Sequence, residues 1–219
     1  MKNITILISG AGSNMKAIVG ACEDDILDAE VTTVIYSRKT GYEEIKDWCK
    51  TYGIKCYQVV KSMFRNDQEY YSKLGGIIAI SKPDLVVLAG YMHVLPERIV
   101  SQYEGRMINI HPSLLPKYPG LHTHGRALNA WDTKTGATVH YVIPELDAGP
   151  IIKQKEVCIY VDDTVEEIEH RVRAIEHGLY ISAIEEILNV GIDIHHRRCC
   201  NAHKKTKKIP ETLETLRNP

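Results

Sequence analysis

The chain has 219 residues, of which 44% are hydrophobic and 25% are charged, a composition typical of one globular domain with a packed core. The formal net charge is −1, and the part before His195 carries 20 basic and 26 acidic residues, which argues against a nucleic-acid-binding surface. No apolar run approaches the ~20 residues that span a bilayer, so no membrane partner is expected.

The six cysteines show no C-x-x-C pair, and the apolar segment near the N-terminus already ends at Ser9. That segment is too short for a secretory signal, and cysteines without a secretory context are typical of free thiols in a reducing compartment. The sequence therefore predicts a cytoplasmic protein without a disulfide framework.

The first 90 residues alternate between strand and helix patterns. Strands are predicted at residues 3–9, 31–36, 55–60 and 84–89, and helices at residues 13–23, 42–51 and 66–81. Apolar strands separated by helices indicate βαβ units, a parallel sheet and right-handed crossovers. The predicted fold is therefore α/β and doubly wound, with a Rossmann-type N-terminal half.

The second half does not continue the regular alternation of strands and helices. Strands are predicted at residues 107–110, 137–143 and 151–159, and a long amphipathic helix at residues 164–189. We expect one domain rather than two, with a mostly parallel sheet, over residues 1–190. Residues 191–219 are rich in Lys, His and Cys with little apolar periodicity, which predicts a basic, flexible C-terminal tail.

A glycine-rich turn at residues 10–14 lies between the first predicted strand and the first helix. Glycines let a backbone approach an anion closely, and a helix N-terminus offers free N–H groups. A dinucleotide fingerprint for NAD would need a glycine at position 15 and an acidic residue after the second strand, and this chain has neither, although Arg38 leaves NADP as an alternative. The segment predicts a single phosphate held by Gly12, Ser13 and Asn14; the alternative is a plain turn with Ser13 or Asn14 as helix N-cap.

Asn109 and His111 lie two residues apart on a predicted strand and therefore share one face of it. Pro112 ends the strand directly after them, at the carboxyl end where open α/β sheets bind ligands. A carboxamide donor beside an imidazole suits the stabilisation of an oxyanion in acyl transfer. The structural alternative is a hydrogen-bonded histidine at a strand end.

The segment from Ile108 to His124, INIHPSLLPKYPGLHTH, resembles the signature of the folate-dependent formyltransferases. The resemblance opens at residues 8–14, continues through residues 136–140, 145–150 and 176–177, and covers about residues 1–190. It implies transfer of the formyl group of 10-formyltetrahydrofolate to the amine of glycinamide ribonucleotide in purine biosynthesis. It also implies small-molecule partners, no metal, and a monomer or homodimer.

The resemblance further implies roles for individual residues. The catalytic residues would be Asn109, His111 and Asp147, with Asp147 paired to His111. The substrate phosphate and ribose would be bound by Gly12, Ser13, Asn14, Arg173 and Glu176. The folate would be bound by Arg65, Met92, His93, Val94, Leu95, Asn109 and Ile143. The chain departs from the family where arginines commonly border the folate, because Asp67 and His93 occupy those positions.

Other readings of the sequence are less well supported. His122 and His124 lack a third ligand of credible spacing, so they are predicted to anchor the loop rather than to bind a metal. A methionyl-tRNA formyltransferase would be expected to carry a basic C-terminal domain, for which the ~30 residues after the last helix are too few. A formyltetrahydrofolate deformylase would be expected to have a further domain before the first strand. A non-catalytic nucleotide-binding module would need the phosphate loop but not the three catalytic residues.

Overall fold

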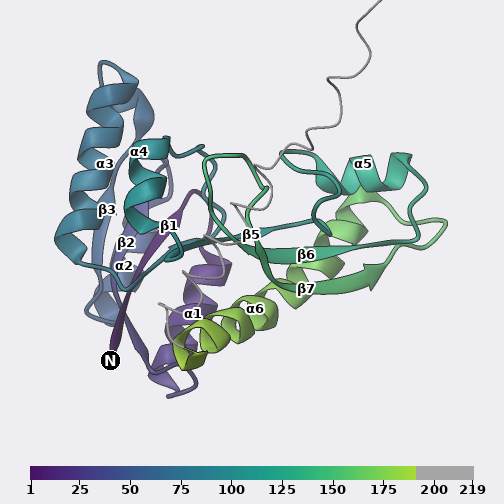
Figure 1. Ribbon diagram of the computed structural model, residues 1–219, viewed down its shortest axis with the longest axis horizontal. Coiled ribbons are helices and arrows are strands. Elements are labelled where there is room, and N and C mark those ends of the chain that lie inside the picture. Colours follow the sequence, from purple (N-terminus) through teal and green to yellow (C-terminus); the bar gives the residue numbers. More distant parts are fainter. Residues whose placement is uncertain (191–219) are drawn as a thin grey trace, which may run out of the picture.

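The computed structural model describes residues 1–190; the predicted tail, residues 191–219, lies outside the described residues. One seven-stranded sheet forms the centre of the molecule, in the order β3-β2-β1-β4-β5-β6-β7 (Figure 1). The strands are β1 (Lys2–Ile8), β2 (Ala29–Tyr36), β3 (Lys55–Gln58), β4 (Leu85–Leu88), β5 (Met107–His111), β6 (Lys134–Tyr141) and β7 (Ile151–Cys158). The strands β1 to β5 pair in parallel, whereas β6 runs antiparallel to both of its neighbours. The prediction of a mostly parallel, doubly wound sheet is confirmed.

Helices cover both faces of this sheet (Figure 1). They are α1 (Ser13–Glu23), α2 (Tyr42–Thr51), α3 (Asp67–Ser81), α4 (Glu97–Val100), α5 (Thr123–Asn129) and α6 (Val165–Val190), with short 3-10 turns at Lys61–Met63 and Ser101–Tyr103. None of the helices described over residues 1–190 is both long and apolar enough to cross a membrane. The sequence predicted the four long helices but not α4 and α5, because one or two turns give too short a stretch for an apolar period to show.

Two apolar cores lie on opposite faces of the sheet. Alternate residues of β1 contribute to each: Ile4 and Ile6 pack with α1, α2 and α6, whereas Leu7 packs with α3 and α4. Side chains of a strand alternate between faces, so a strand that is covered on both sides becomes continuously apolar. This explains why the central strands β1 and β4 could be recognised from the sequence alone.

The chain between β5 and α5, residues 112–122, is called the 112–122 loop below. It contains a cis peptide bond between Leu115 and Pro116. It is tied to the two antiparallel strands, since the Leu115 N–H donates to Thr138 Oγ1 at 3.1 Å and Gln154 Nε2 donates to the Leu115 carbonyl at 2.8 Å. These bonds hold the loop over the carboxyl end of β5.

Candidate active site

A buried imidazole–carboxylate pair lies at the carboxyl end of β5. His111 is the last residue of that strand, and Asp147 comes from the turn between β6 and β7. His111 Nδ1 and Asp147 Oδ2 are 3.3 Å apart, and their side chains are only 7% and 8% exposed. Water is thus largely excluded from the pair, and an electrostatic interaction between the two groups is stronger there than at the surface. The structure brings together the two residues that the family resemblance paired.

Asn109 is connected to this pair through His140, whose role no sequence pattern indicated. In the antiparallel register Asn109 lies opposite His140 of β6, and Asn109 Nδ2 is 3.3 Å from His140 Nε2. Burial lowers the pKa of His140, which favours the neutral ring. His140 Nδ1 lies 2.9 Å from the Tyr141 carbonyl, which can only accept, so Nδ1 carries the hydrogen. Nε2 then accepts one N–H of the Asn109 amide, and the second N–H remains available to a ligand.

The carboxylate of Asp147 is held from several directions. Its Oδ2 accepts the backbone N–H of Gly120 at 2.8 Å, and its Oδ1 lies 3.7 Å from His140 Nε2. The other ring nitrogen of His111, Nε2, is 2.9 Å from the carbonyl oxygen of Tyr118. Both nitrogens of His111 therefore face oxygen acceptors, an arrangement that the protonated ring satisfies completely.

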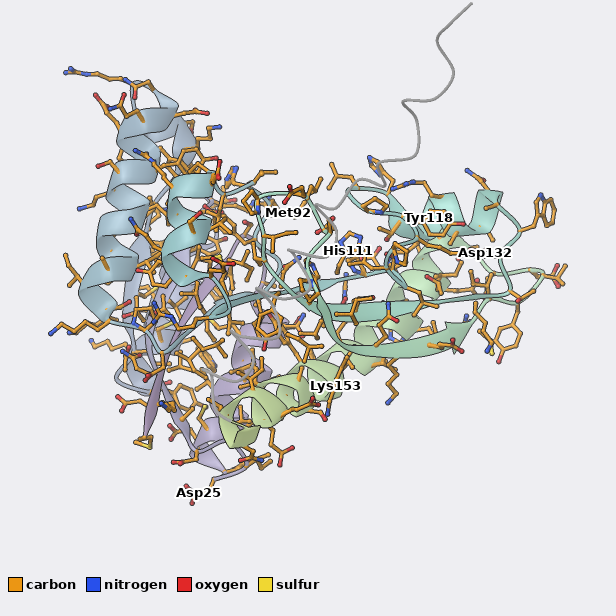
Figure 2. The ribbon with its side chains drawn as sticks, viewed as in Figure 1. Asp25, Met92, His111, Tyr118, Asp132 and Lys153 are labelled. Carbon is orange, nitrogen blue, oxygen red and sulfur yellow. The ribbon has the colours of Figure 1, made fainter. Side chains whose placement is uncertain are left out.

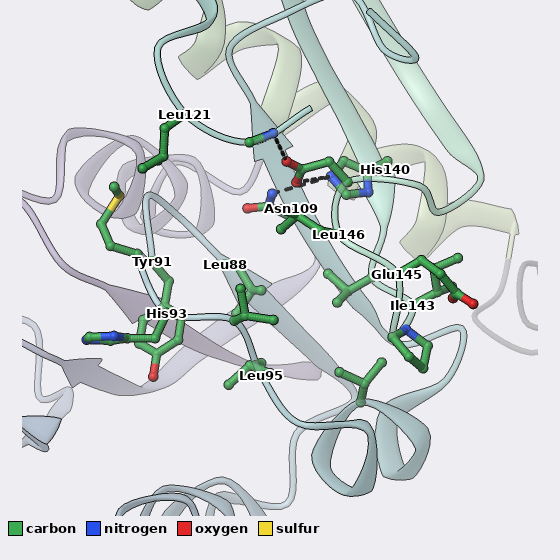
Figure 3. A pocket seen from close by; sticks show the side chains of 17 residues that line it. Leu88, Tyr91, His93, Leu95, Asn109, Leu121, His140, Ile143, Glu145 and Leu146 are labelled. Carbon is green, nitrogen blue, oxygen red and sulfur yellow. Dashed lines mark hydrogen bonds and ion pairs between the residues drawn. The ribbon is translucent and has the colours of Figure 1, made fainter. Parts of the chain in front are cut away.

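A cavity of about 340 Å³ opens next to these groups (Figure 3). Its walls are mostly apolar, and Asn109 and His140 gather at one end of it. Asp147, whose Oδ1 lies 3.7 Å from His140 Nε2, also lines the cavity. A concave apolar site with a few convergent polar groups is typical of small-molecule binding. The predicted folate residues that line the cavity are Met92, His93, Val94, Leu95, Asn109 and Ile143.

The folate-side cation predicted from the sequence is not at this cavity. Arg65 is exposed before α3, where its backbone N–H donates to Glu69 Oε2 at 3.2 Å. Among the described residues that line the cavity, none is Lys or Arg. Asp67 instead forms an ion pair with Lys61 at 2.8 Å. Burial, and secondarily the charge of Lys61, lower the pKa of His93, so this wall of the cavity presents a neutral imidazole.

The phosphate loop predicted from the sequence meets α6. Gly12 adopts a left-handed backbone (φ 72°) at the start of α1, and neither Ser13 nor Asn14 caps the helix with its side chain. Asn14 is buried, and its Nδ2 donates to Glu176 Oε2 at 2.9 Å. The simple N-cap interpretation of this segment is therefore wrong, and the structure instead joins the loop to a carboxylate of α6.

One further side chain on each of α6 and α5, Arg173 and His124, lies within electrostatic range of the other. Arg173 is exposed one turn before Glu176 and forms an ion pair with Glu169. His124 of α5 lies within electrostatic range of both Arg173 and His111, and burial lowers its pKa. Over residues 1–190 no group of three or more His, Cys, Asp or Glu side chains is arranged to hold a metal. His122 occupies the N-cap of α5 with a left-handed backbone, a position in the loop rather than in a ligand cluster.

Comparison with known proteins places these features in a family. The family model described as formyl transferase matches residues 2–184. The phosphoribosylglycinamide formyltransferase of Escherichia coli (strain K12) is 39% identical over 193 residues, which cover 88% of this chain and 90% of that protein. A solved phosphoribosylglycinamide formyltransferase from Coxiella burnetii is 42% identical with a TM-score of 0.77, and the match covers 84% of this chain and 85% of that one.

A related hydrolase shares the fold but less of the sequence. A formyltetrahydrofolate deformylase from Pseudomonas syringae is 27% identical with a TM-score of 0.78, and the match covers 84% of this chain but 60% of that one. The family match extends over most of the described residues and includes Asn109, His111 and Asp147. The chain therefore belongs to the formyl transferase family.

Proposed function

We propose that this chain transfers the formyl group of 10-formyltetrahydrofolate to the amine of glycinamide ribonucleotide, in purine biosynthesis. The observation that carries the proposal is the buried Asp147–His111 pair, because its carboxylate lines an apolar cavity together with Asn109. Relatives named phosphoribosylglycinamide formyltransferase align along nearly their whole length, which supports the same acceptor here.

The cavity would hold the folate. Its apolar walls at Met92, Val94, Leu95 and Ile143 suit a flat ring system, and His93 would border the ring as a neutral imidazole. Arg65 would act only on a part of the folate that extends beyond the cavity, because its side chain does not line it. The reactive end of the folate would then lie beside Asn109 and Asp147.

The ribonucleotide would lie between α1 and α6. The backbone N–H groups of Gly12, Ser13 and Asn14 lie at the N-terminus of helix α1 and would bind the phosphate. Glu176 would accept hydrogen bonds from the ribose, and Arg173, one turn away on α6, would reach the phosphate. Binding at the phosphate fixes the position of the amine, which turns remote binding energy into orientation at the reacting atoms.

The reaction would proceed through a tetrahedral intermediate. The amine nitrogen attacks the formyl carbon and forms the new C–N bond, while the carbonyl π electrons move to the oxygen. The free N–H of Asn109 donates to that oxygen, which contributes roughly 3 kcal/mol, and proton transfer by His111 contributes ~10²–10⁴ in rate. The amine loses one proton, and the folate nitrogen gains one as its bond to the formyl carbon breaks. His111 and Asp147 therefore relay protons without net change.

The proposed partners are these two small molecules. Among the described residues Cys22, Cys49, Cys56 and Cys158 are free thiols, which supports a place in the reducing cytoplasm. The proposed reaction assigns roles to side chains, backbone N–H groups and the two substrates, and to no metal.

A spectrophotometric assay with 10-formyltetrahydrofolate tests the proposal. Formation of tetrahydrofolate should require glycinamide ribonucleotide, and one formylated ribonucleotide should appear for each folate consumed. The variant H111A should be inactive in the same assay. Release of formate at the same rate without the ribonucleotide would overturn the proposal and indicate a hydrolase.

A further inference from the structure

The 112–122 loop contacts both members of the catalytic pair. The carbonyl oxygen of Tyr118 lies 2.9 Å from His111 Nε2, and the N–H of Gly120 donates to Asp147 Oδ2 at 2.8 Å. Two backbone groups only two residues apart therefore set the orientation of the imidazole and of the carboxylate. What holds this short stretch in place also holds the pair.

The Tyr118 carbonyl decides which nitrogen of His111 can exchange a proton. A carbonyl oxygen can only accept a hydrogen bond, so Nε2 must carry hydrogen in both the neutral and the protonated ring. The hydrogen bond made by one ring nitrogen fixes the role of the other. Nδ1, 3.3 Å from Asp147 Oδ2, is then the nitrogen that passes its proton to that carboxylate and takes it back during the reaction, and Asp147 borders the cavity.

Tyr118 does not adopt its conformation by backbone preference. Its φ is 56°, in the left-handed region that a bulky side chain rarely occupies. Contacts with its surroundings must therefore compensate, and two of them involve its own side chain. Its O–H donates to Asp132 Oδ2 at 2.8 Å, and the guanidinium of Arg126 lies 5.2 Å from the centre of its ring.

Asp132 is the point at which these contacts converge. It follows α5, and both of its oxygens also accept from Lys117 Nζ, at 2.9 and 3.0 Å. These hydrogen bonds, first from Lys117 and then from Tyr118, lower the pKa of Asp132, so it is ionised at neutral pH. Tyr118 lies between His111 and Asp132, and Asp132 itself does not line the cavity (Figure 2).

The exposure of Lys117 indicates whether the contacts of Asp132 stabilise the whole fold or only position the Tyr118 carbonyl. The side chain of Lys117 is 61% exposed and that of Asp132 is 19% exposed, and an ion pair that water reaches contributes little to the free energy of unfolding. The hydrogen bonds to Asp132 come from Lys117 and Tyr118, and the carbonyl of Tyr118 contacts His111. Their main consequence is therefore local, on the position of the Tyr118 carbonyl.

We propose that Asp132 is a positioning residue for the reaction. Through the hydroxyl of Tyr118 and the ammonium of Lys117, it keeps the Tyr118 carbonyl on His111 Nε2, so that His111 works through Nδ1. The part of this inference that concerns the rate rests on the proposed formyl transfer. The part that concerns the hydrogen on Nε2 is a property of the protein without substrate.

The test combines ¹⁵N NMR of histidine-labelled protein with steady-state kinetics. In the wild-type protein the His111 signals, assigned by their loss in H111A, should show hydrogen on Nε2 across the titration and exchange at Nδ1 alone. D132A removes the acceptor for both Tyr118 and Lys117, and Y118F removes only one bond while it keeps the backbone carbonyl.

D132A should lower kcat by about tenfold to a hundredfold, since a displacement of about 1 Å at a catalytic group has such an effect. Y118F should lower it less, and both variants should leave the KM for glycinamide ribonucleotide within about twofold of wild type, because the phosphate loop is not altered.

The control removes another exposed ion pair, which joins the first residue of β6 to β7. Lys134 Nζ and Glu156 Oε2 are 2.6 Å apart, with both side chains more than half exposed, and E156Q should leave kcat and the His111 signals unchanged. Hydrogen on Nδ1 rather than Nε2 in the wild-type protein would overturn the inference. It would also be overturned if D132A and Y118F left kcat unchanged, or lowered kcat with the His111 signals unchanged. If the wild-type protein did not formylate the ribonucleotide but showed the expected signals, only the proposed function would be wrong; should D132A not fold, Y118F decides.

Discussion

Asn14 Nδ2 donates to Glu176 Oε2 at 2.9 Å, which joins the first turn of α1 to the middle of α6 across 162 positions of the chain. Burial raises the pKa of Glu176, and the hydrogen bond from Asn14 counteracts part of that effect. The amide thus partly stabilises a carboxylate that the surroundings disfavour. This contact gives the proposed ribonucleotide site a defined edge.

The substitution N14D should weaken binding of the ribonucleotide selectively. A carboxylate at position 14 would face both Glu176 and the substrate phosphate, and unit charges ~4 Å apart repel by about 4 kcal/mol near a protein surface. We expect the KM for glycinamide ribonucleotide to rise at least about tenfold, which corresponds to ~1.4 kcal/mol, while the KM for the folate changes little. Steady-state kinetics with each substrate varied in turn measures both values.

N66D provides the control for that experiment. Asn66 caps α3, where its side chain accepts from the Glu69 N–H, and aspartate is an equally good cap. Both KM values should stay at the wild-type level in N66D. If N14D also left both unchanged, the phosphate loop would not belong to the site.

Replacement of Asp147 by asparagine should reduce turnover through His111. Asparagine keeps the size and much of the hydrogen bonding but removes the charge that lies 3.3 Å from His111 Nδ1. We expect kcat to fall by at least ~10²-fold. Adding H111A to D147N should cost far less than the two single losses multiplied, because coupled groups act as one unit.

D25N is the matched control for the charge and the backbone. Asp25 has a left-handed backbone (φ 56°) like that of Asp147 (φ 51°), and it lies far from His111 (Figure 2). Its kcat should equal that of the wild-type protein. If the kcat losses of D147N and H111A multiplied fully in the double variant, Asp147 would only shape its turn. The same would hold if the loss of kcat in D147N were explained by a lowered melting temperature.

The substitution E176Q should stabilise the free protein at neutral pH while it weakens substrate binding. A raised pKa in the folded state means that folding favours the protonated acid, so stability is fully present below the unfolded-state pKa and falls as the pH rises through the folded-state pKa. Glutamine resembles the protonated acid and avoids this loss. The melting temperatures of wild type and E176Q should therefore coincide near pH 4 and diverge in favour of E176Q towards pH 7.

The KM for glycinamide ribonucleotide should rise in E176Q, since the ribose loses a charged acceptor. E185Q changes an exposed residue of the same helix and should alter neither quantity. A melting temperature of E176Q below that of wild type at pH 7 would contradict the assignment of burial as the dominant influence on Glu176.

The substitution G149A should damage the turn that carries Asp147. A Cβ atom at Gly149 would overlap the backbone carbonyl of Tyr141, which cannot move without disturbing the β6–β7 pairing. Both the melting temperature and kcat should fall. G76A is the control, because a Cβ there meets no atom within 4 Å and alanine is the better helix former by up to ~1 kcal/mol. A fully active G149A would show that the turn can relax without moving Asp147.

Much of this architecture could be predicted from local patterns. The strands β1 and β4 are buried on both faces and are therefore continuously apolar in sequence. The helix α6 is buried on one face and therefore shows a helical apolar period. The placement of Asn109 and His111 on one face of β5 follows from the two-residue repeat of a strand.

The rest depends on register and on loop geometry. His140 meets Asn109 only because β6 pairs antiparallel with β5 in one particular alignment, and a shift of one residue would turn His140 to the other face. The contact of Tyr118 with His111 depends on a left-handed backbone held by residues up to 14 positions away. The family resemblance supplied Asp147, but not the Gly120 and His140 contacts that hold it.

The turn between β6 and β7 carries two tasks on one short piece of chain. It supplies Ile143, Pro144, Glu145 and Leu146 to the wall of the cavity, and Asp147 to His111. Both strands that flank it are paired in the sheet, so an inserted or deleted residue in the turn would shift Asp147 relative to His111. Variation in the length of this turn would alter the shape of the proposed folate cavity and the position of the acid together. Redesign of the enzyme for a different one-carbon donor therefore has to keep the length of this turn and change only its side chains.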